Sequence, residues 1–158
     1  MASNQVLIKL LKPIYSVFGI GYIKIGSGTV CSIVPCLLIW FFGDHLSLIA
    51  RIFLAIFILL VSLLSSNLEF DTKDPSYVVI DEFLGMWIAL IFTSSTFSFV
   101  WILIAFFLFR FFDITKSLGI SKIEKINGAV GIVFDDVLAG LYTLLIVSLL
   151  SFTVNYFI

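Results

Sequence analysis

The sequence predicts an all-α integral membrane protein: about five hydrophobic helices in a bundle, preceded by an amphipathic helix that lies in the membrane interface. Of its 158 residues, 61% are hydrophobic and only 12% are charged, and the mean hydropathy is +1.22. These values lie outside the usual range of soluble domains. We expect one membrane-embedded domain over residues 1–158, with the interfacial helix and a glycine-rich loop in 1–28 and the bundle in 29–158.

The amphipathic helix is expected over residues 6–18. Pro13 is expected to kink it. One face carries apolar side chains and the lysines lie off it, a pattern typical of a helix in the headgroup plane. The apolar face holds Leu7, Leu11, Ile14, Tyr15 and Phe18, and the lysines are Lys9 and Lys12. Residues 19–29 follow as a glycine-punctuated loop that allows close approach of the backbone to another group.

Five apolar runs follow the loop and are the candidate membrane helices. The second and fifth runs are long enough to cross a hydrocarbon core of ~30 Å, whereas the first and third measure roughly 20 Å. The short runs are expected to be extended, tilted or partly inserted. The runs are 29–42, 47–66, 82–93, 97–112 and 137–157.

Lysine and arginine residues predict the orientation. If all five runs cross the membrane, nearly every cation lies on the side of the N-terminus, and only Arg51 lies toward the other side. The positive-inside rule makes that common side cytoplasmic and puts the C-terminus outside. The cations on the common side are Lys9, Lys12, Lys24, Lys73, Lys116, Lys122 and Lys125, with Arg110 at its boundary.

Carboxylates gather on the same side. Eight of the ten fall into three short stretches, each of which begins or ends an apolar run: residues 69–82, Asp113 alone, and Asp135 with Asp136. Asp81 and Glu82 in the first stretch could simply cap a helix, and Asp113 could belong to a local ion-pair ladder with its neighbouring cations. Crowded carboxylates without a His or Cys cluster instead favour Mg²⁺ over zinc.

A magnesium site beside Lys24, Arg110 and Lys116 would suit a phosphorylated substrate, because cations offset the charge that develops as a P–O bond breaks. Ser27 and Thr29 open the first apolar run, where hydroxyl and backbone N–H groups could bind phosphate. The alternative is that these hydroxyls only cap the helix.

Other chemistries lack the residues that they need. There is no basic patch with interleaved aromatics for nucleic acid. Cys31 and Cys36 lie about 140° apart on a helix, which favours neither a disulfide nor a metal pair, and no arginine follows either at the spacing of a thiol phosphatase. His45, the single histidine, lies on the side opposite the acids, so we expect no Ser-His-Asp triad.

Four motifs in order resemble the phosphatidylglycerophosphatase A family over about residues 19–140. They are Gly19-Ile20-Gly21-Tyr22-Ile23-Lys24 with Ser27-Gly28-Thr29; Asp74-Pro75 with Val79-Ile80-Asp81-Glu82-Phe83-Leu84-Gly85-Met86-Trp87; Phe109-Arg110-Phe111-Phe112-Asp113-Ile114-Thr115-Lys116; and Gly131-Ile132-Val133-Phe134-Asp135-Asp136-Val137-Leu138-Ala139-Gly140. The chain departs from the family pattern at Val30-Cys31, at Ser117 and over 127–130, which spares every acid.

The resemblance implies Mg²⁺-dependent hydrolysis of phosphatidylglycerophosphate to phosphatidylglycerol and phosphate at the bacterial inner membrane. It carries the family's acidic positions over to Asp81, Glu82, Asp113, Asp135 and Asp136. We expect all of these except Asp113 to supply most of the metal ligands, Asp113 to act as ligand or general base, and the cations and hydroxyls named above to hold phosphate.

Two other functions remain open as alternatives. A non-enzymatic cation-binding or transport protein would also place carboxylates among helices, although a transporter more often carries an acid at mid-span. A CDP-alcohol phosphotransferase would require a longer Asp-Gly…Ala-Arg…Gly…Asp pattern, which the chain lacks.

Overall fold

The computed structural model describes residues 11–69, 77–93 and 99–157. Within these residues the chain is helical and contains no strand. Parts of two expected features lie outside the described residues: the beginning of the amphipathic helix, and the acids and lysine of 70–76. Residues 11–15 are helical, and the 3₁₀ turn η1 (Ile20–Tyr22) follows.

The principal helices correspond to the predicted runs. They are α2 (Ser27–Phe42), α3 (Leu48–Glu69), α4 (Ile80–Ala89), α5 (Phe99–Thr115) and α7 (Ala129–Phe157), with the 3₁₀ turn η2 (Gly43–His45) after α2 and a short helix α6 (Ile120–Glu124) before α7. Among the described helices, three segments are long and apolar enough to cross a membrane: Ser27–His45, Leu48–Ser65 and Ala129–Val154.

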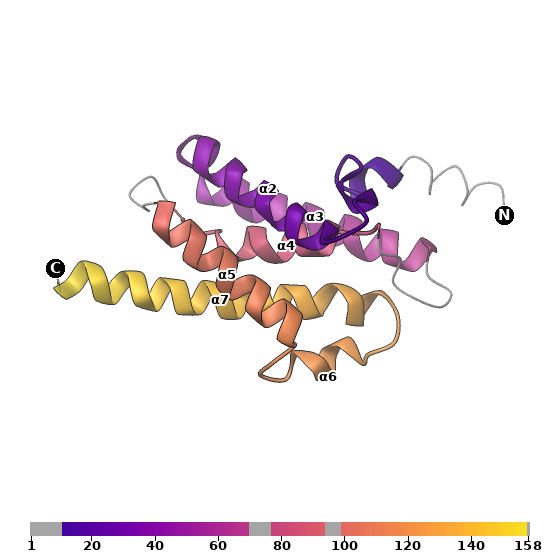
Figure 1. Ribbon diagram of the computed structural model, residues 1–158. Helices are drawn as coiled ribbons and strands as arrows, with labels where there is room; N and C mark the ends of the chain where they lie inside the picture. Colours follow the sequence, from indigo (N-terminus) through magenta and orange to yellow (C-terminus); the bar gives the residue numbers. More distant parts are fainter. Residues whose placement is uncertain (1–10, 70–76, 94–98, 158) are drawn as a thin grey trace.

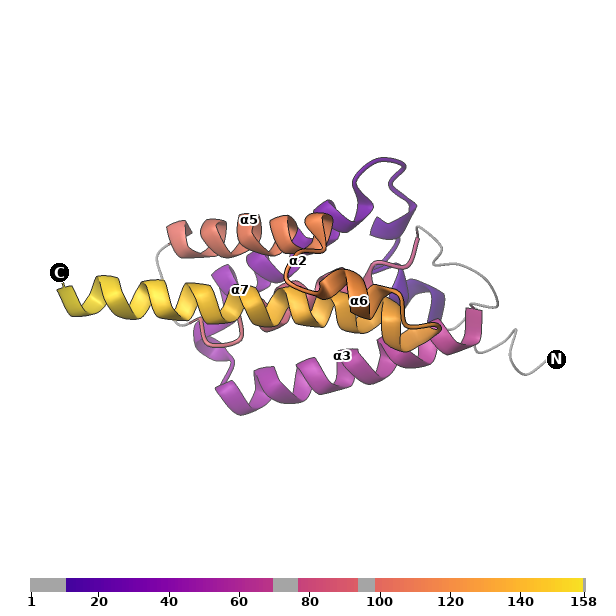
Figure 2. The ribbon, with the colours of Figure 1, turned by 90° about the horizontal axis from the view of Figure 1, so that it is seen from below.

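Helix α4 lies at the centre of the bundle. It packs against α7, α2, α3 and α5, and α7 runs along almost the whole length of the molecule beside it (Figure 1). Seen from below, α3 and α5 lie on opposite sides of α7, and α6 covers the beginning of α7 (Figure 2). The side chains of Trp87, Met86 and Leu90 are fully buried, because α4 is surrounded by other helices rather than by lipid.

The close crossing of α4 and α7 depends on two glycines. A Cβ at Gly140 would lie 2.3 Å from the carbonyl oxygen of Gly85, and a Cβ at Gly85 would lie 2.6 Å from the carbonyl oxygen of Asp136. Small residues of this kind let the backbones of membrane helices approach each other. The crossing therefore places the acids at the beginning of α4 beside the acids near the beginning of α7.

The opposite end of α4 is held by Arg51, whose side chain is buried. Its guanidinium donates hydrogen bonds to the carbonyl of Ile91, at 3.1 Å, and to those of Thr93 and Gly43. The Trp87 indole N–H donates in turn to the Arg51 carbonyl at 3.1 Å. Carbonyl groups at the end of a helix have no intrahelical donors, and inside a membrane protein water rarely supplies them. Arg51 therefore supplies hydrogen-bond donors to the carbonyl groups just after the end of α4, inside the bundle.

Candidate active site

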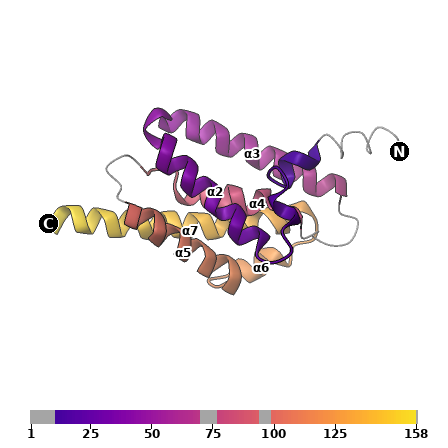
Figure 3. The ribbon, with the colours of Figure 1, turned by 45° about the horizontal axis from the view of Figure 1, so that its top comes forward.

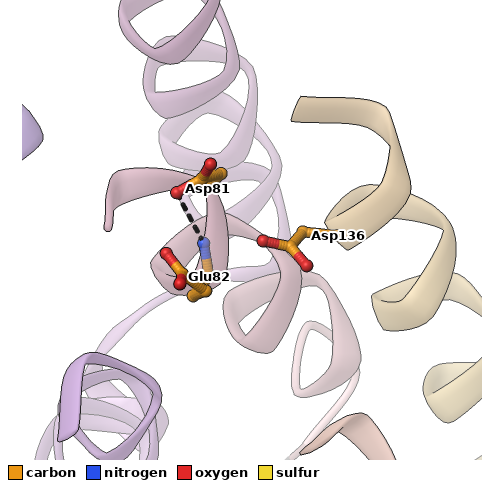
Figure 4. A group of neighbouring side chains, drawn as sticks. All are labelled: Asp81, Glu82 and Asp136. Atoms are coloured by element: carbon orange, nitrogen blue, oxygen red, sulfur yellow. Dashed lines mark hydrogen bonds between the residues drawn. The ribbon is translucent and has the colours of Figure 1, made fainter. Parts of the chain in front are cut away.

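Three carboxylates converge where α4 meets α7. Asp81, Glu82 and Asp136 each offer an oxygen that lies within 4.8 Å of the oxygens of the other two. Figure 4 shows the Asp136 carboxylate of α7 pointing toward the two acids of α4, with the Glu82 backbone N–H donating to Asp81 Oδ1 at 3.2 Å. Asp81 and Asp136 are each only 4% exposed. This is the most compact group of acids that the described residues form.

Glu82 has an oxygen without a partner. Its Oε2 is buried and accepts no hydrogen bond from any described residue. Leaving a buried carboxylate oxygen unsatisfied is costly unless a cation or donor compensates it. Three clustered carboxylate oxygens with one unsatisfied atom are the hard-oxygen donor set that Mg²⁺ prefers. The residues present therefore fit a magnesium ion.

The amino end of α2 lies against Glu82. A Cβ at Gly28 would lie 2.2 Å from Glu82 Oε1 and 3.0 Å from its Cδ. Only a glycine leaves room for the carboxylate at this distance, so the first turn of α2 fixes one side of the acid cluster.

Lys116 joins the remaining acids to the cluster. Its Nζ lies 2.8 Å from Asp113 Oδ1, 2.7 Å from Asp135 Oδ2 and 3.5 Å from Asp136 Oδ1. Burial alone would lower the pKa of Lys116, but the charges of Asp136 and Asp113 outweigh burial and hold that pKa above its usual range. The ammonium group therefore remains charged beside the acid cluster.

Arg110 approaches Asp113 from one turn earlier on α5. Its Nη1 lies 2.5 Å from Asp113 Oδ2, while its Nε is buried and has no hydrogen-bond partner among the residues that the structure describes. Asp113 therefore pairs with two cations, Arg110 and Lys116.

The acid cluster and Lys116 line a cavity of about 360 Å³. It is lined by Asp81, Glu82, Asp113, Lys116, Glu124, Ile132, Asp135 and Asp136. All five acids predicted from the sequence line it, together with one of the predicted phosphate-binding cations. The other predicted phosphate-binding residues do not line the cavity, although one of them, Arg110, contacts Asp113 directly. These residues are Lys24, Ser27, Thr29 and Arg110.

The structure separates the two adjacent acids of α7. Asp135 lies next to Asp136 but contacts Lys116, and its Oδ1 accepts a hydrogen bond of 2.8 Å from the Asp136 backbone N–H. The compact trio does not include Asp135. Sequence reasoning did not include Glu124 or Gly28 in the site. Glu124 is one acid in a short polar segment, and nothing in the sequence shows that α6 folds back over the cavity.

Comparison with known proteins identifies the same family as the sequence motifs. The sequence profile of the phosphatidylglycerophosphatase A family matches residues 14–151. A phosphatidylglycerophosphatase A from Haemophilus influenzae is 37% identical over 164 residues, covering 96% of this chain and 98% of the relative. One from Escherichia coli K12 is 34% identical over 73 residues, which cover 46% of this chain and 42% of that protein.

A relative from Bacteroides thetaiotaomicron, provisionally named as a phosphatidylinositol-3-phosphatase, is 43% identical over 84 residues. The aligned part covers 52% of this chain and about half, 53%, of that protein. No solved structure matches the chain significantly. Since the family profile covers most of the sequence and one relative aligns over nearly its whole length, the chain belongs to the phosphatidylglycerophosphatase A family.

Proposed function

We propose that this chain, a phosphatidylglycerophosphatase by family, hydrolyses phosphatidylglycerophosphate to phosphatidylglycerol and inorganic phosphate with Mg²⁺, as a step of phospholipid biosynthesis. The observation that carries the proposal is the compact trio of Asp81, Glu82 and Asp136, with its unsatisfied oxygen, in one cavity with the Lys116 ammonium group. Oxygen ligands beside a fixed cation suit a phosphate monoester rather than an uncharged substrate.

The trio would hold the metal. Bound there, Mg²⁺ would polarise the phosphate oxygens and favour attack by water on phosphorus. Lys116 and Arg110 stabilise the charge that develops on the phosphate oxygens, and Asp113 orients both cations through the ion pairs at 2.8 and 2.5 Å. The P–O bond to the headgroup glycerol breaks, and the glycerol oxygen leaves with a proton derived from the attacking water.

The membrane arrangement belongs to the same proposal. Residues 1–158 form one domain, a bundle of about five hydrophobic helices that an amphipathic helix in the interface precedes. The segments Ser27–His45, Leu48–Ser65 and Ala129–Val154 are long enough to cross the bilayer, whereas α4, with 10 residues, is too short to cross a ~30 Å hydrocarbon core by itself. Figure 3 shows the short α4 between the longer α3 and α7. The lysine distribution favours a cytoplasmic active site in the bacterial inner membrane.

Phosphate release by the purified protein tests the proposal. We expect Mg²⁺-dependent release from phosphatidylglycerophosphate that EDTA abolishes, and a loss of at least about 10²-fold in Asp81→Asn and in Asp136→Asn. Asp44→Asn, which alters an exposed acid in η2 at the other end of α2, should retain full activity. Normal turnover in both site variants would refute the assigned roles.

A lipid panel tests the substrate. The name of the Bacteroides relative makes phosphatidylinositol 3-phosphate the appropriate second lipid. Faster turnover of that lipid would preserve the phosphatase chemistry but replace the proposed substrate. Ion flux through liposomes without phosphate release would instead favour the transport alternative.

A further inference from the structure

Two turns at the active-site end of the bundle share an unusual backbone conformation. Phe18 has φ 53° and is followed by Gly19 at 93°, and Leu118 has φ 53° and is followed by Gly119 at 90°. This left-handed conformation is unfavourable for bulky L-residues. Nevertheless, Phe18 is 91% exposed and Leu118 is 68% exposed. Each turn therefore adopts a strained backbone that points a large apolar side chain away from the protein.

Both turns lie beside the membrane-crossing helices rather than beyond their ends. Phe18 lines an apolar hollow of about 190 Å³ together with Leu54, Phe57 and Ile58. Those α3 residues belong to a candidate span that continues to Ser65. Ser65 is seven positions beyond Ile58, or about 10 Å farther along the helix. Phe18 is therefore level with the interior of the α3 span.

The Leu118 turn is fixed at a comparable depth on α7. The Tyr142 hydroxyl donates a hydrogen bond of 3.0 Å to the Leu118 carbonyl. Tyr142 lies within the candidate span Ala129–Val154, six positions, or about 9 Å, farther into that span than Asp136. This hydrogen bond ties Leu118 to a residue in the interior of the α7 span, so Leu118 lies at the depth of the lipid beside that span.

The surroundings of both turns are those of a lipid interface. Exposed apolar side chains lie close by in sequence, Ile25 at 88% and Ile114 at 69% exposure. The lysines Lys24, Lys122 and Lys125 are exposed in the same segments. Apolar residues interspersed with lysines match the acyl boundary and the anionic headgroups of a phospholipid leaflet.

We propose that the Phe18 and Leu118 turns are embedded in the phospholipid leaflet, so that the acid cavity receives its substrate sideways from that leaflet rather than from water. Leu118 is two residues from Lys116, and its turn forms the edge across which a lipid phosphate reaches the ammonium group. The sideways path rests on the proposed phosphatase function. The leaflet contact of the two turns does not.

Spin labelling in vesicles of phosphatidylethanolamine and phosphatidylglycerol tests the leaflet contact. Labels are attached at Phe18→Cys and Leu118→Cys in a chain carrying Cys31→Ser and Cys36→Ala, because serine keeps a donor for the Val79 carbonyl that Cys31 contacts at 3.0 Å. Phe53→Cys, in the α3 span and 69% exposed, is the lipid reference. Asn127→Cys, at an exposed polar position before α7, is the aqueous reference.

We expect the labels at positions 18 and 118 to resemble the Phe53→Cys reference, with frequent collisions with oxygen and few with a water-soluble nickel complex. Labels that collide with nickel as often as the label at Asn127→Cys would overturn the leaflet contact. This measurement requires no turnover, so it separates failure of the leaflet contact from failure of the proposed function.

Kinetics test the sideways path. Phe18→Ser and Leu118→Ser should raise KM about fivefold for long-chain phosphatidylglycerophosphate in vesicles, because the turns lose apolar burial in lipid. Turnover of the water-soluble dihexanoyl substrate should remain unchanged. Equal losses with both substrates, or no change with either, would refute the path. If the unmodified protein cleaves neither, the proposed function itself fails and the path with it.

Discussion

Gly28→Ala should separate activity from stability, because the added methyl group meets a carboxylate rather than backbone. The Cβ would lie 2.2 Å from Glu82 Oε1, whereas ordinary contacts begin at 3.4 Å, so the oxygen must retreat by about 1.2 Å. A displacement of about 1 Å at a reacting centre can cost about 10²-fold in rate. We therefore expect the rate of phosphate release to fall by about 10²-fold.

The stability of the Gly28→Ala variant should not decrease. The Glu82 side chain can rotate away, and alanine is the better helix former by up to about 1 kcal/mol. We expect an unchanged or higher apparent Tm in detergent. Gly43→Ala is the matched control at the other end of the same helix, since its Cβ would meet only ordinary contacts at 3.5 and 3.6 Å, and it should leave both quantities unchanged.

A double variant tests the cause directly. Glu82→Asp shortens the side chain by one methylene, which makes room for the new methyl group. The Gly28→Ala/Glu82→Asp variant should therefore be more active than the product of the two single losses predicts. Phosphate release is measured from mixed micelles with Mg²⁺. Gly28→Ala activity within about threefold of the unmodified protein would refute the placement of Glu82 against α2.

Three further perturbations act elsewhere in the bundle. Gly140→Ala places a methyl group 2.3 Å from the backbone oxygen of Gly85, which cannot move aside, so the apparent Tm should fall with a destabilisation of about 1–3 kcal/mol; an unchanged Tm would contradict the close crossing. Arg51→Met leaves the Ile91 carbonyl and its neighbours without a donor, costing about 1–3 kcal/mol for each buried group; Arg51→Lys should recover part of the lost Tm, and equal stability of all three proteins would contradict the capping role. Lys116→Met should lower phosphate release at saturating Mg²⁺ by about 10²-fold with little change in far-ultraviolet circular dichroism, and full activity would remove Lys116 from the site.

The positions of most helices could be predicted from the sequence, since hydropathy marks the segments that avoid water. The boundaries could not, because hydropathy does not measure helicity. The last run was predicted from residue 137, yet α7 begins at Ala129, so Asp135 and Asp136 lie within the helix. The third run was predicted over 82–93, but α4 ends at Ala89.

The acids of the site could be predicted because charge in an apolar chain is rare and its position is therefore informative. Their division into groups depends on packing. Asp135 and Asp136 are equivalent in the sequence, but the helical turn directs only Asp136 toward Glu82 and leaves Asp135 beside Lys116. The backbone contact between Gly85 and Gly140 is equally absent from any local pattern, because the two residues are brought together only by the crossing helices.

Arg51 also implies an order of assembly during biosynthesis. A charge inside an apolar helix opposes membrane insertion by about 2.5–3.5 kcal/mol near the centre of the bilayer, and by less near its surface. Two of its acceptors, the carbonyls of Gly43 and Leu46, precede it by only a few residues, so the nascent α2–α3 hairpin can shield the charge as soon as it forms. The carbonyls of Ile91 and Thr93 emerge from the ribosome some 40 residues later. The hairpin therefore forms first and presents the Arg51 side chain to which the end of α4 then binds.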